Sequence, residues 1–229
     1  MASKRDATRA AIFDVDGTLV DTNHLHVVTW WEAFRQAGRH VPMREIHRAV
    51  GLSGGDLLDH LLGDDGRSPE EDEQLTAAHH ALYATYFERL PALDAAGDLL
   101  RALAGRGWQI VLATSASGAE LAALRRAIDA DDVILGATSA DDVADGKPAP
   151  DPVRQARELA AVPSEQAVFI GDTVWDMKAA VRDGVTPVAV LSGGIPAADL
   201  KTAGAQAVYR DPADILEHLH TSLLADREP

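Results

Sequence analysis

Cysteine is absent from the 229-residue chain, and lysine is scarce. Without cysteine the protein has no disulfide bond, no thiolate metal ligand and no cysteine nucleophile. The four lysines are Lys4, Lys147, Lys178 and Lys201, and the formal net charge is -15. Because phosphate backbones are bound by clusters of Lys and Arg, these charges argue against a nucleic-acid-binding surface.

The sequence also lacks a long hydrophobic run. No stretch approaches the roughly 18 apolar residues that span a membrane, and residues 1–9 contain no apolar signal core. We therefore expect a cytoplasmic protein with no membrane partner. We expect it to be either a monomer or a homodimer. The composition, 46% hydrophobic and 25% charged, suits one large globular domain or a domain with an insertion.

Short runs rich in Ile, Val and Leu predict strands that are buried on both faces of a parallel sheet. These runs are Ala10–Phe13, Gln109–Ala113, Val133–Leu135, Ala167–Ile170 and Pro187–Leu191. Apolar residues at helical spacing follow or separate the later runs. The expected helices are Gly118–Ile128, Pro152–Ala161, Trp175–Asp183 and Pro212–Leu224. This alternation predicts an α/β fold, a three-layer Rossmann-like core around a parallel sheet.

The region from Thr22 to Leu90 breaks this alternation, because it contains helical patterns and no convincing strand. The expected helices are Asn23–Ala37, Met43–Val50, Asp56–Leu62 and Pro69–Arg89. We therefore predict an all-helical insertion after the first strand. The chain should leave the core near Val20–Thr22 and return near Leu90–Leu93.

Polar side chains follow the expected strands, at the sheet edge where open α/β folds bind their ligands. They are Asp14, Asp16, Thr114, Ser115, Lys147, Asp172 and Asp176. Carboxylates placed this closely repel one another unless a cation lies among them, and Mg²⁺ is the usual cation for a few carboxylates and several waters. Lys147 and the hydroxyls would complete a cradle for a phosphoryl group.

Four segments resemble, in order and spacing, the four motifs of the haloacid dehalogenase superfamily. They are "DVDGT", Thr114 after an apolar strand, Lys147 before a proline, and "GDTVWD". The helical insertion resembles the C1-type cap of the phosphoglycolate phosphatase and β-phosphoglucomutase-like branch. The resemblance implies a core of residues 1–20 and 93–229 and a cap of residues 21–92. It also implies a Mg²⁺-dependent phosphatase that acts on a small phosphorylated metabolite.

The resemblance further implies a role for each motif residue. Asp14 would form an aspartyl-phosphate, and Asp16 would act as general acid and then general base. Thr114 and Lys147 would hold the phosphoryl group. The implied metal ligands are Asp14, the Asp16 backbone carbonyl and Asp172, with Asp176 close behind. The implied substrate contacts are Thr18, Ser115, Arg48 and Gly51.

Other residues of the insertion leave alternatives open. Arg48 would either meet a second anionic group of the substrate or lie solvated on a helix. His24 and His26 are expected to be packing or hinge residues. Ser53 lies in "GLSGG", which matches the G-x-S-x-G pattern of serine hydrolases, but that pattern needs a preceding strand and a helix is expected there.

The sequence argues against two branches of the superfamily and leaves a third, the phosphomutases, as an alternative. Enzymes that dehalogenate 2-haloacids lack the second aspartate, so Asp16 favours phosphate chemistry. Cleavage of phosphonoacetaldehyde needs a cap lysine, and no lysine lies between Lys4 and Lys147. A phosphomutase of the β-phosphoglucomutase type would share nearly all the catalytic residues and stays an alternative to hydrolysis.

Overall fold

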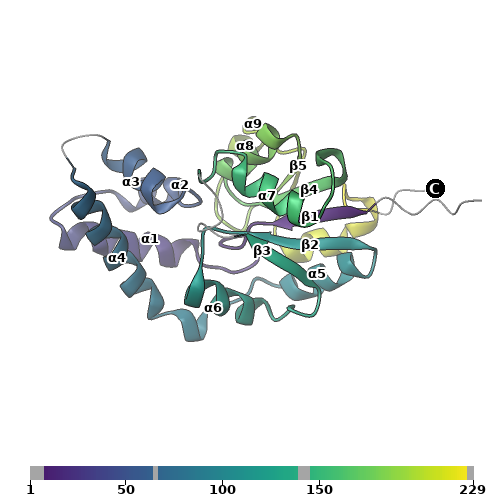
Figure 1. Ribbon diagram of the computed structural model, residues 1–229, viewed down its shortest axis with the longest axis horizontal. Helices are drawn as coiled ribbons and strands as arrows, with labels where there is room; N and C mark the ends of the chain where they lie inside the picture. Colours follow the sequence, from purple (N-terminus) through teal and green to yellow (C-terminus); the bar gives the residue numbers. More distant parts are fainter. Residues whose placement is uncertain (1–7, 64–66, 139–144, 226–229) are drawn as a thin grey trace, which may run out of the picture.

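Six parallel strands form one sheet in the order β3-β2-β1-β4-β5-β6 (Figure 1). A computed structural model describes residues 8–63, 67–138 and 145–225. The strands are β1 (Arg9–Phe13), β2 (Trp108–Ala113), β3 (Ile134–Thr138), β4 (Ala167–Gly171), β5 (Thr186–Val190) and β6 (Ala207–Tyr209). The five strands expected from the sequence are present, and β6 is an additional short edge strand.

Helices cover both faces of the sheet (Figure 1). One face packs on α5 (Ala96–Ala104), α6 (Gly118–Ile128) and α10 (Pro212–Glu217), and the other on α7 (Asp151–Leu159) and α8 (Val174–Asp183). A short α9 (Ala197–Thr202) packs beside α8. Successive strand residues point to opposite faces, so Phe13 joins the first core cluster and Ile12 the second. The predicted three-layer α/β fold is confirmed.

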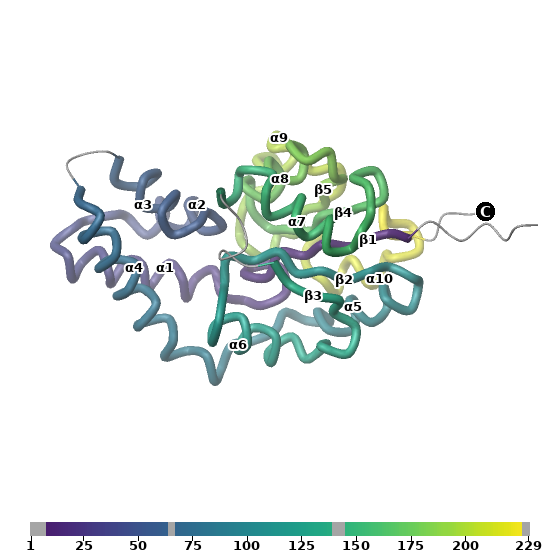
Figure 2. Tube along the Cα trace, in the orientation of Figure 1, coloured from purple at the N-terminus to yellow at the C-terminus, as the bar shows by residue number. Residues whose placement is uncertain are grey.

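Four helices between β1 and α5 form a separate group beside the sheet, as the tube in Figure 2 shows. They are α1 (Asn23–Gln36), α2 (Met43–Ala49), α3 (Gly54–Leu62) and α4 (Pro69–Ala84), followed by a 3₁₀ turn, η1 (Phe87–Arg89). These helices bury a hydrophobic cluster of their own, which includes Trp30, Phe34, Ile46 and Leu58. The insertion therefore has its own core, apart from the clusters that pack on the sheet.

The chain leaves and re-enters the sheet region through two segments that pair with each other. The Asp21 N–H donates to the Pro91 carbonyl oxygen at 2.9 Å, and the Leu93 N–H donates to the Leu19 carbonyl oxygen at 2.9 Å. Val20 forms an antiparallel bridge with Ala92 between these two hydrogen bonds. The four helices are thus joined to the sheet by one narrow, two-stranded connection.

Several expected helix boundaries were wrong. The helix expected over Pro69–Arg89 ends at Ala84, and the helix expected over Pro212–Leu224 ends at Glu217; each is followed by a 3₁₀ turn. The helix expected from Asp56 begins at Gly54, because the Ser53 side chain caps it by accepting from the Asp56 N–H. Within the described part of the chain, no helix is both long and apolar enough to cross a membrane.

Candidate active site

The carboxyl ends of β1, β2 and β4 lie together at one edge of the sheet, because β1 is the strand between the other two. Asp14 follows β1, and its N–H donates to the Ile170 carbonyl oxygen of β4 at 2.9 Å. Thr114 follows β2, and Asp172 follows β4. The sheet order therefore brings together side chains that are far apart in the sequence.

Lys147 is a buried ammonium group enclosed by carboxylates. Its Nζ donates to Oδ1 of Asp14 at 2.5 Å and to the Ala113 carbonyl oxygen at 3.2 Å, and it lies 2.8 Å from Oδ1 of Asp176. Burial disfavours the ammonium, but the two carboxylates outweigh it and raise the pKa of Lys147 above its ordinary value. Lys147 is therefore positively charged and balances part of the acidic cluster.

Asp172 is fully buried and is held by two side-chain donors. Thr18 Oγ1 donates to Asp172 Oδ1 at 3.1 Å and lies 3.2 Å from Oδ2 of Asp14. Asn23 Nδ2 donates to Asp172 Oδ2 at 2.7 Å. Burial and the charges of Asp14 and Asp176 nevertheless raise the pKa of Asp172 well above its ordinary value. The cluster has more negative charge than its own cation balances.

Asp14, Asp172 and Asp176 are spaced to share a cation. Each offers an oxygen atom that lies within 4.8 Å of the other two, and all three residues are buried. Burial, together with the charges of Asp176 and Asp16, raises the pKa of Asp14 to about 7 in spite of Lys147. A hard divalent cation would relieve this repulsion, so the donor set fits the Mg²⁺ expected from the sequence.

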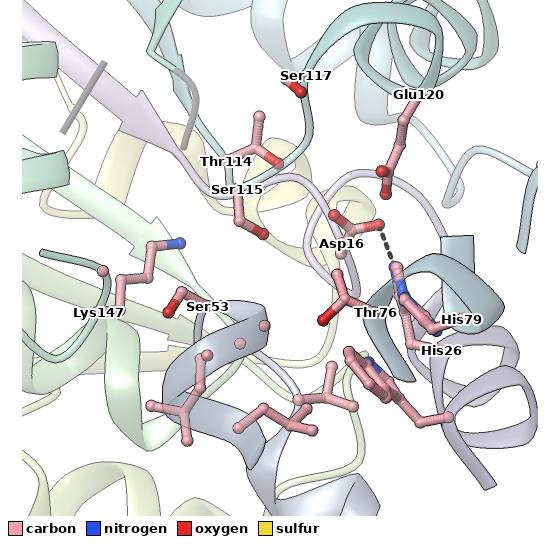
Figure 3. A pocket seen from close by; sticks show the side chains of 18 of the residues that line it. Asp16, His26, Ser53, Thr76, His79, Thr114, Ser115, Ser117, Glu120 and Lys147 are labelled. Atoms are coloured by element: carbon pink, nitrogen blue, oxygen red, sulfur yellow. Dashed lines mark hydrogen bonds and ion pairs between the residues drawn. The ribbon is translucent and has the colours of Figure 1, made fainter. Parts of the chain in front are cut away.

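Asp16 is held by two residues of the insertion. Thr22 Oγ1 donates to Oδ1 of Asp16 at 2.6 Å, and His26 Nε2 lies 3.2 Å from the same oxygen (Figure 3). Burial alone would raise the pKa of Asp16, but His26 and Thr22 outweigh it and lower the pKa below its ordinary value. For His26, burial alone would lower the pKa, but the Asp16 carboxylate outweighs it and raises the pKa. The expectation that His26 is a packing or hinge residue missed this contact.

A cavity of about 460 Å³ lies beside Asp14 and Asp16, and residues of α1, the loop between α2 and α3, α3 and α4 line its other side. Figure 3 shows Asp16 in this cavity with Ser53, Thr76 and His79 of the insertion. Gly51, in the loop between α2 and α3, lines it and has a φ of 99°. A Cβ at Gly51 would lie 2.9 Å from Thr173, so only glycine lets this loop approach the core so closely. The expected site residues that line the cavity are Asp14, Asp16, Gly51, Thr114, Ser115 and Lys147.

Arg48 lies outside this cavity. It is exposed on α2 and lines a second hollow, of about 630 Å³, between the insertion and the core. Its carbonyl oxygen accepts a hydrogen bond from Trp175 Nε1 at 3.0 Å. The structure thus places Arg48 exposed on a helix, away from the cavity beside Asp14 and Asp16.

Ser53 lines the first cavity but does not have the surroundings of a serine nucleophile. Its hydroxyl donates to Oδ2 of Asp56 at 2.6 Å, and α2 precedes its loop where a nucleophile elbow needs a strand. Ser53 instead caps α3. These contacts argue against the serine-hydrolase alternative.

Two further residues of the site were not anticipated. Asn23, the first residue of α1, holds Asp172 from a position 149 residues away in the sequence. Glu120 of α6 points toward Asp16 and His26 across the cavity (Figure 3). Burial, with the charge of Asp16, raises the pKa of Glu120 to about 7. Neither residue lies in a motif, so only the folded chain reveals them.

Comparison with known proteins gives matches along most of the chain. Residues 8–184 match the model of the haloacid dehalogenase-like hydrolases. A phosphoglycolate phosphatase from Rhodospirillum rubrum is 31% identical over 90% of this chain and 89% of its own length. The probable phosphatase IndB from Dickeya dadantii is 30% identical over 95% of this chain and 96% of its own length. The crystal structure of a hydrolase from Pseudomonas syringae has a TM-score of 0.89 at 35% identity, over 96% of this chain and 100% of that one.

The fold and the matched residues together define a hydrolase with its site at the carboxyl edge of a parallel sheet. The chain belongs to the haloacid dehalogenase-like hydrolases. Within that family its relatives place it among the phosphatases, in the phosphoglycolate phosphatase-like branch. The family and the enzyme class expected from the sequence are confirmed.

Proposed function

We propose that the protein is a Mg²⁺-dependent phosphatase that hydrolyses a small phosphorylated metabolite through an aspartyl-phosphate on Asp14. One observation carries the proposal: the Asp14 carboxylate sits at a strand end with Lys147 on one oxygen and Thr18 beside the other. Lys147 and Thr18 fix the orientation of the carboxylate, and the cavity beside it gives a phosphate ester room to approach.

In the first step, an oxygen of Asp14 attacks phosphorus and the bond from phosphorus to the ester oxygen breaks. The ester oxygen takes a proton from Asp16 and leaves as an alcohol. In the second step, Asp16 removes a proton from water, the water oxygen attacks phosphorus, and the Asp14 carboxylate is released with inorganic phosphate. The proton that Asp16 takes from water is then shared with His26, which restores the resting Asp16–His26 pair.

His26 supports the proton transfers by sharing a proton with Asp16. At rest the two form an ion pair, because the pKa of Asp16 is lowered and that of His26 is raised. Charge that develops on the ester oxygen would draw the shared proton to Asp16 and onward to the leaving group. The hydrogen bond from Thr22 keeps the carboxylate in place during this transfer.

The transferred phosphoryl group needs donors for its oxygens. We assign this role to the Lys147 ammonium and to the hydroxyls of Thr114 and Ser115, all of which line the cavity. The Thr114 hydroxyl also accepts from the Ala116 N–H at 3.1 Å, which fixes its orientation. Preoriented donors of this kind stabilise charge without reorganisation during the reaction.

Bound Mg²⁺ would supply the positive charge that this acidic cluster lacks and would polarise the phosphoryl group. The side chains of Asp14 and Asp172 and the backbone carbonyl of Asp16 would hold it. Asp176, whose oxygens already face Thr173 and Lys147, would stand behind them as an electrostatic partner.

We also propose that residues 21–92 act as a lid over a core of residues 1–20 and 93–229. The lid supplies Thr22 and His26 to Asp16, and the two paired connections at Val20 and Ala92 form a narrow hinge. Closure of such a lid excludes water and completes the site. A protein locked open should therefore lose turnover of phosphate esters while keeping its sheet intact.

The test is release of inorganic phosphate from a panel of phosphate monoesters, with and without Mg²⁺. Wild type should be active only with the metal, and Asp14→Asn should be inactive yet fold normally. The exposed Asp94 provides the matched control, since Asp94→Asn should keep full activity. A fully active Asp14→Asn would refute the proposal, and an isomerised sugar phosphate with little free phosphate would replace it with a phosphomutase.

A further inference from the structure

The part of the cavity that would receive the leaving group is lined by neutral polar groups and by an acid, with no lysine or arginine among its described residues. It lies between Asp16 and the insertion, and its polar groups are hydroxyls, imidazoles and one further carboxyl. These groups belong to Ser53, Thr76, His79, His80, Ser117 and Glu120, and the apolar residues Trp30, Leu52 and Leu57 complete the wall. A ligand bound there meets many neutral hydrogen-bonding groups and a second acid.

Lysine and arginine are scarce among the described residues that line the cavity. Among the described residues that line it, Lys147 is the only Lys or Arg, and it is already paired with Asp14 and Asp176. The segments 64–66 and 139–144, outside the described residues, contain no Lys or Arg in the sequence. Arg48, the arginine expected to meet a second anion, lines the other hollow.

The imidazoles do not replace the missing cation. His26 is paired with the Asp16 carboxylate at 3.2 Å, so its charge is already balanced. His79 is buried, stacks on Trp30 with 4.2 Å between ring centroids, and lies 3.0 Å from the Thr29 hydroxyl. Burial and the nearby His26 lower the pKa of both His79 and His80, so these rings are neutral.

Negative charge lies where the leaving group would extend. Glu120 reaches from α6 toward Asp16 and His26 (Figure 3). A carboxylate or second phosphate on the substrate would approach Glu120 in a partly enclosed site, where like charges repel more strongly than in water. Hydroxyl groups, in contrast, find acceptors on the carboxyls and imidazoles and donors on Thr76 and Ser117.

We propose that the natural substrate is a phosphate monoester whose leaving group is an uncharged polyol, a sugar or sugar alcohol with no carboxylate and no second phosphate. This inference rests on the proposed phosphatase function and narrows it. It disfavours phosphoglycolate, whose leaving group is an anion. It also disfavours sugar phosphomutation, because a bisphosphate bound across the site would place its second phosphate beside Glu120.

The test compares pairs of esters in which one member has an added negative charge at the end far from the ester. sn-Glycerol 3-phosphate and 3-phosphoglycerate have the same carbon count and ester position, but one ends in CH₂OH and the other in a carboxylate. Glucose 6-phosphate and glucose 1,6-bisphosphate differ by one phosphate. With saturating Mg²⁺, kcat/KM should favour the uncharged member of each pair at least about tenfold, because a buried like-charge contact disfavours the other member.

Variants of one residue assign the discrimination. Glu120→Gln removes the charge and keeps the shape, so the preference for glycerol 3-phosphate over 3-phosphoglycerate should fall by at least about threefold. The assay is run well above the pKa of about 7 of this carboxyl, where wild type carries the charge. Glu158→Gln, on the exposed face of α7, is the matched control and should leave the ratio unchanged.

The outcomes separate the inference from the function on which it rests. If the anionic member of each pair is hydrolysed as well as or better than the neutral one, the substrate class is wrong while the phosphatase function stands. If Glu120→Gln leaves the ratio unchanged, the assignment of the discrimination to Glu120 is overturned. If neither the four esters nor p-nitrophenyl phosphate releases phosphate with Mg²⁺, the proposed function itself fails.

Discussion

Replacement of Lys147 by methionine tests how the acidic cluster is balanced. Methionine is an unbranched side chain only one atom shorter than lysine, but it leaves Asp14 and Asp176 buried without their cation, which lies 2.5 Å and 2.8 Å from them. At an effective dielectric constant of about 20, unit charges roughly 4 Å apart attract by about 4 kcal/mol. The cost of burying the ammonium offsets part of the attraction that Lys147 has for Asp14 and Asp176. We therefore expect the free energy of unfolding to fall by about 3–5 kcal/mol in metal-free buffer.

The pH dependence gives this prediction a distinctive signature. The pKa of Asp14 is already raised to about 7, and loss of Lys147 raises it further. A carboxyl with a raised native pKa keeps a proton that the unfolded chain releases, so native stability falls as the pH rises toward the native pKa. The loss caused by Lys147→Met should therefore be larger near about pH 8 than near about pH 6, because protonation relieves the cluster at the lower pH.

Urea denaturation followed by circular dichroism measures the effect. Saturating Mg²⁺ should reduce the loss, because the dication supplies the missing positive charge. The exposed Lys201 of α9 is the matched control, and Lys201→Met should change stability by less than about 0.5 kcal/mol. Wild-type stability for Lys147→Met in metal-free buffer at the higher pH would refute the charge balance described here.

Three further perturbations follow from individual contacts. In metal-free protein, NMR titration should place the pKa of His26 above 6.5, and Asp16→Asn should lower it; an unchanged value would rule out their ion pair. Asn23→Ala removes the hydrogen-bond donor to Asp172 and should weaken Mg²⁺ binding, measured by calorimetry, about tenfold. An unaltered Mg²⁺ affinity would show that Asn23 does not support Asp172 as a metal ligand. Buried His79 stays neutral in the native protein, whereas the same histidine in the unfolded chain gains a proton below pH 6.5, so native stability falls on acidification. In urea unfolding, His79→Asn should lose less stability than wild type as the pH is lowered. An equal loss in the two proteins would contradict this role of His79.

Much of the fold could be predicted from the sequence because each buried strand is a short apolar run. The ends of those runs also located the polar residues at the sheet edge, since parallel strands present their carboxyl ends on the same side. β6 and α9 were missed because three and six residues carry too little periodicity to stand out. α5 was also missed, although Leu99, Leu100 and Leu103 point into the core at helical spacing.

The contacts made by the insertion could not be predicted, because they depend on how it docks on the sheet. His26 reaches Asp16 and Asn23 reaches Asp172 only after α1 has packed beside the strand ends. The same docking decides that Arg48 lines the second hollow while Glu120 lines the first. Local sequence patterns specify which helix forms, but not which of its faces meets the substrate.

The most direct test of the central claim is to trap the covalent intermediate. Wild-type protein is mixed with glycerol 3-phosphate and Mg²⁺, quenched within one turnover, and reduced with borohydride, which converts an aspartyl-phosphate to homoserine. Peptide mass spectrometry should find homoserine at position 14 only when substrate and Mg²⁺ are both present. Two results obtained while substrate is turned over would contradict Asp14 as the nucleophile. One is homoserine at the position of another aspartate, and the other is an unmodified Asp14 throughout the single turnover.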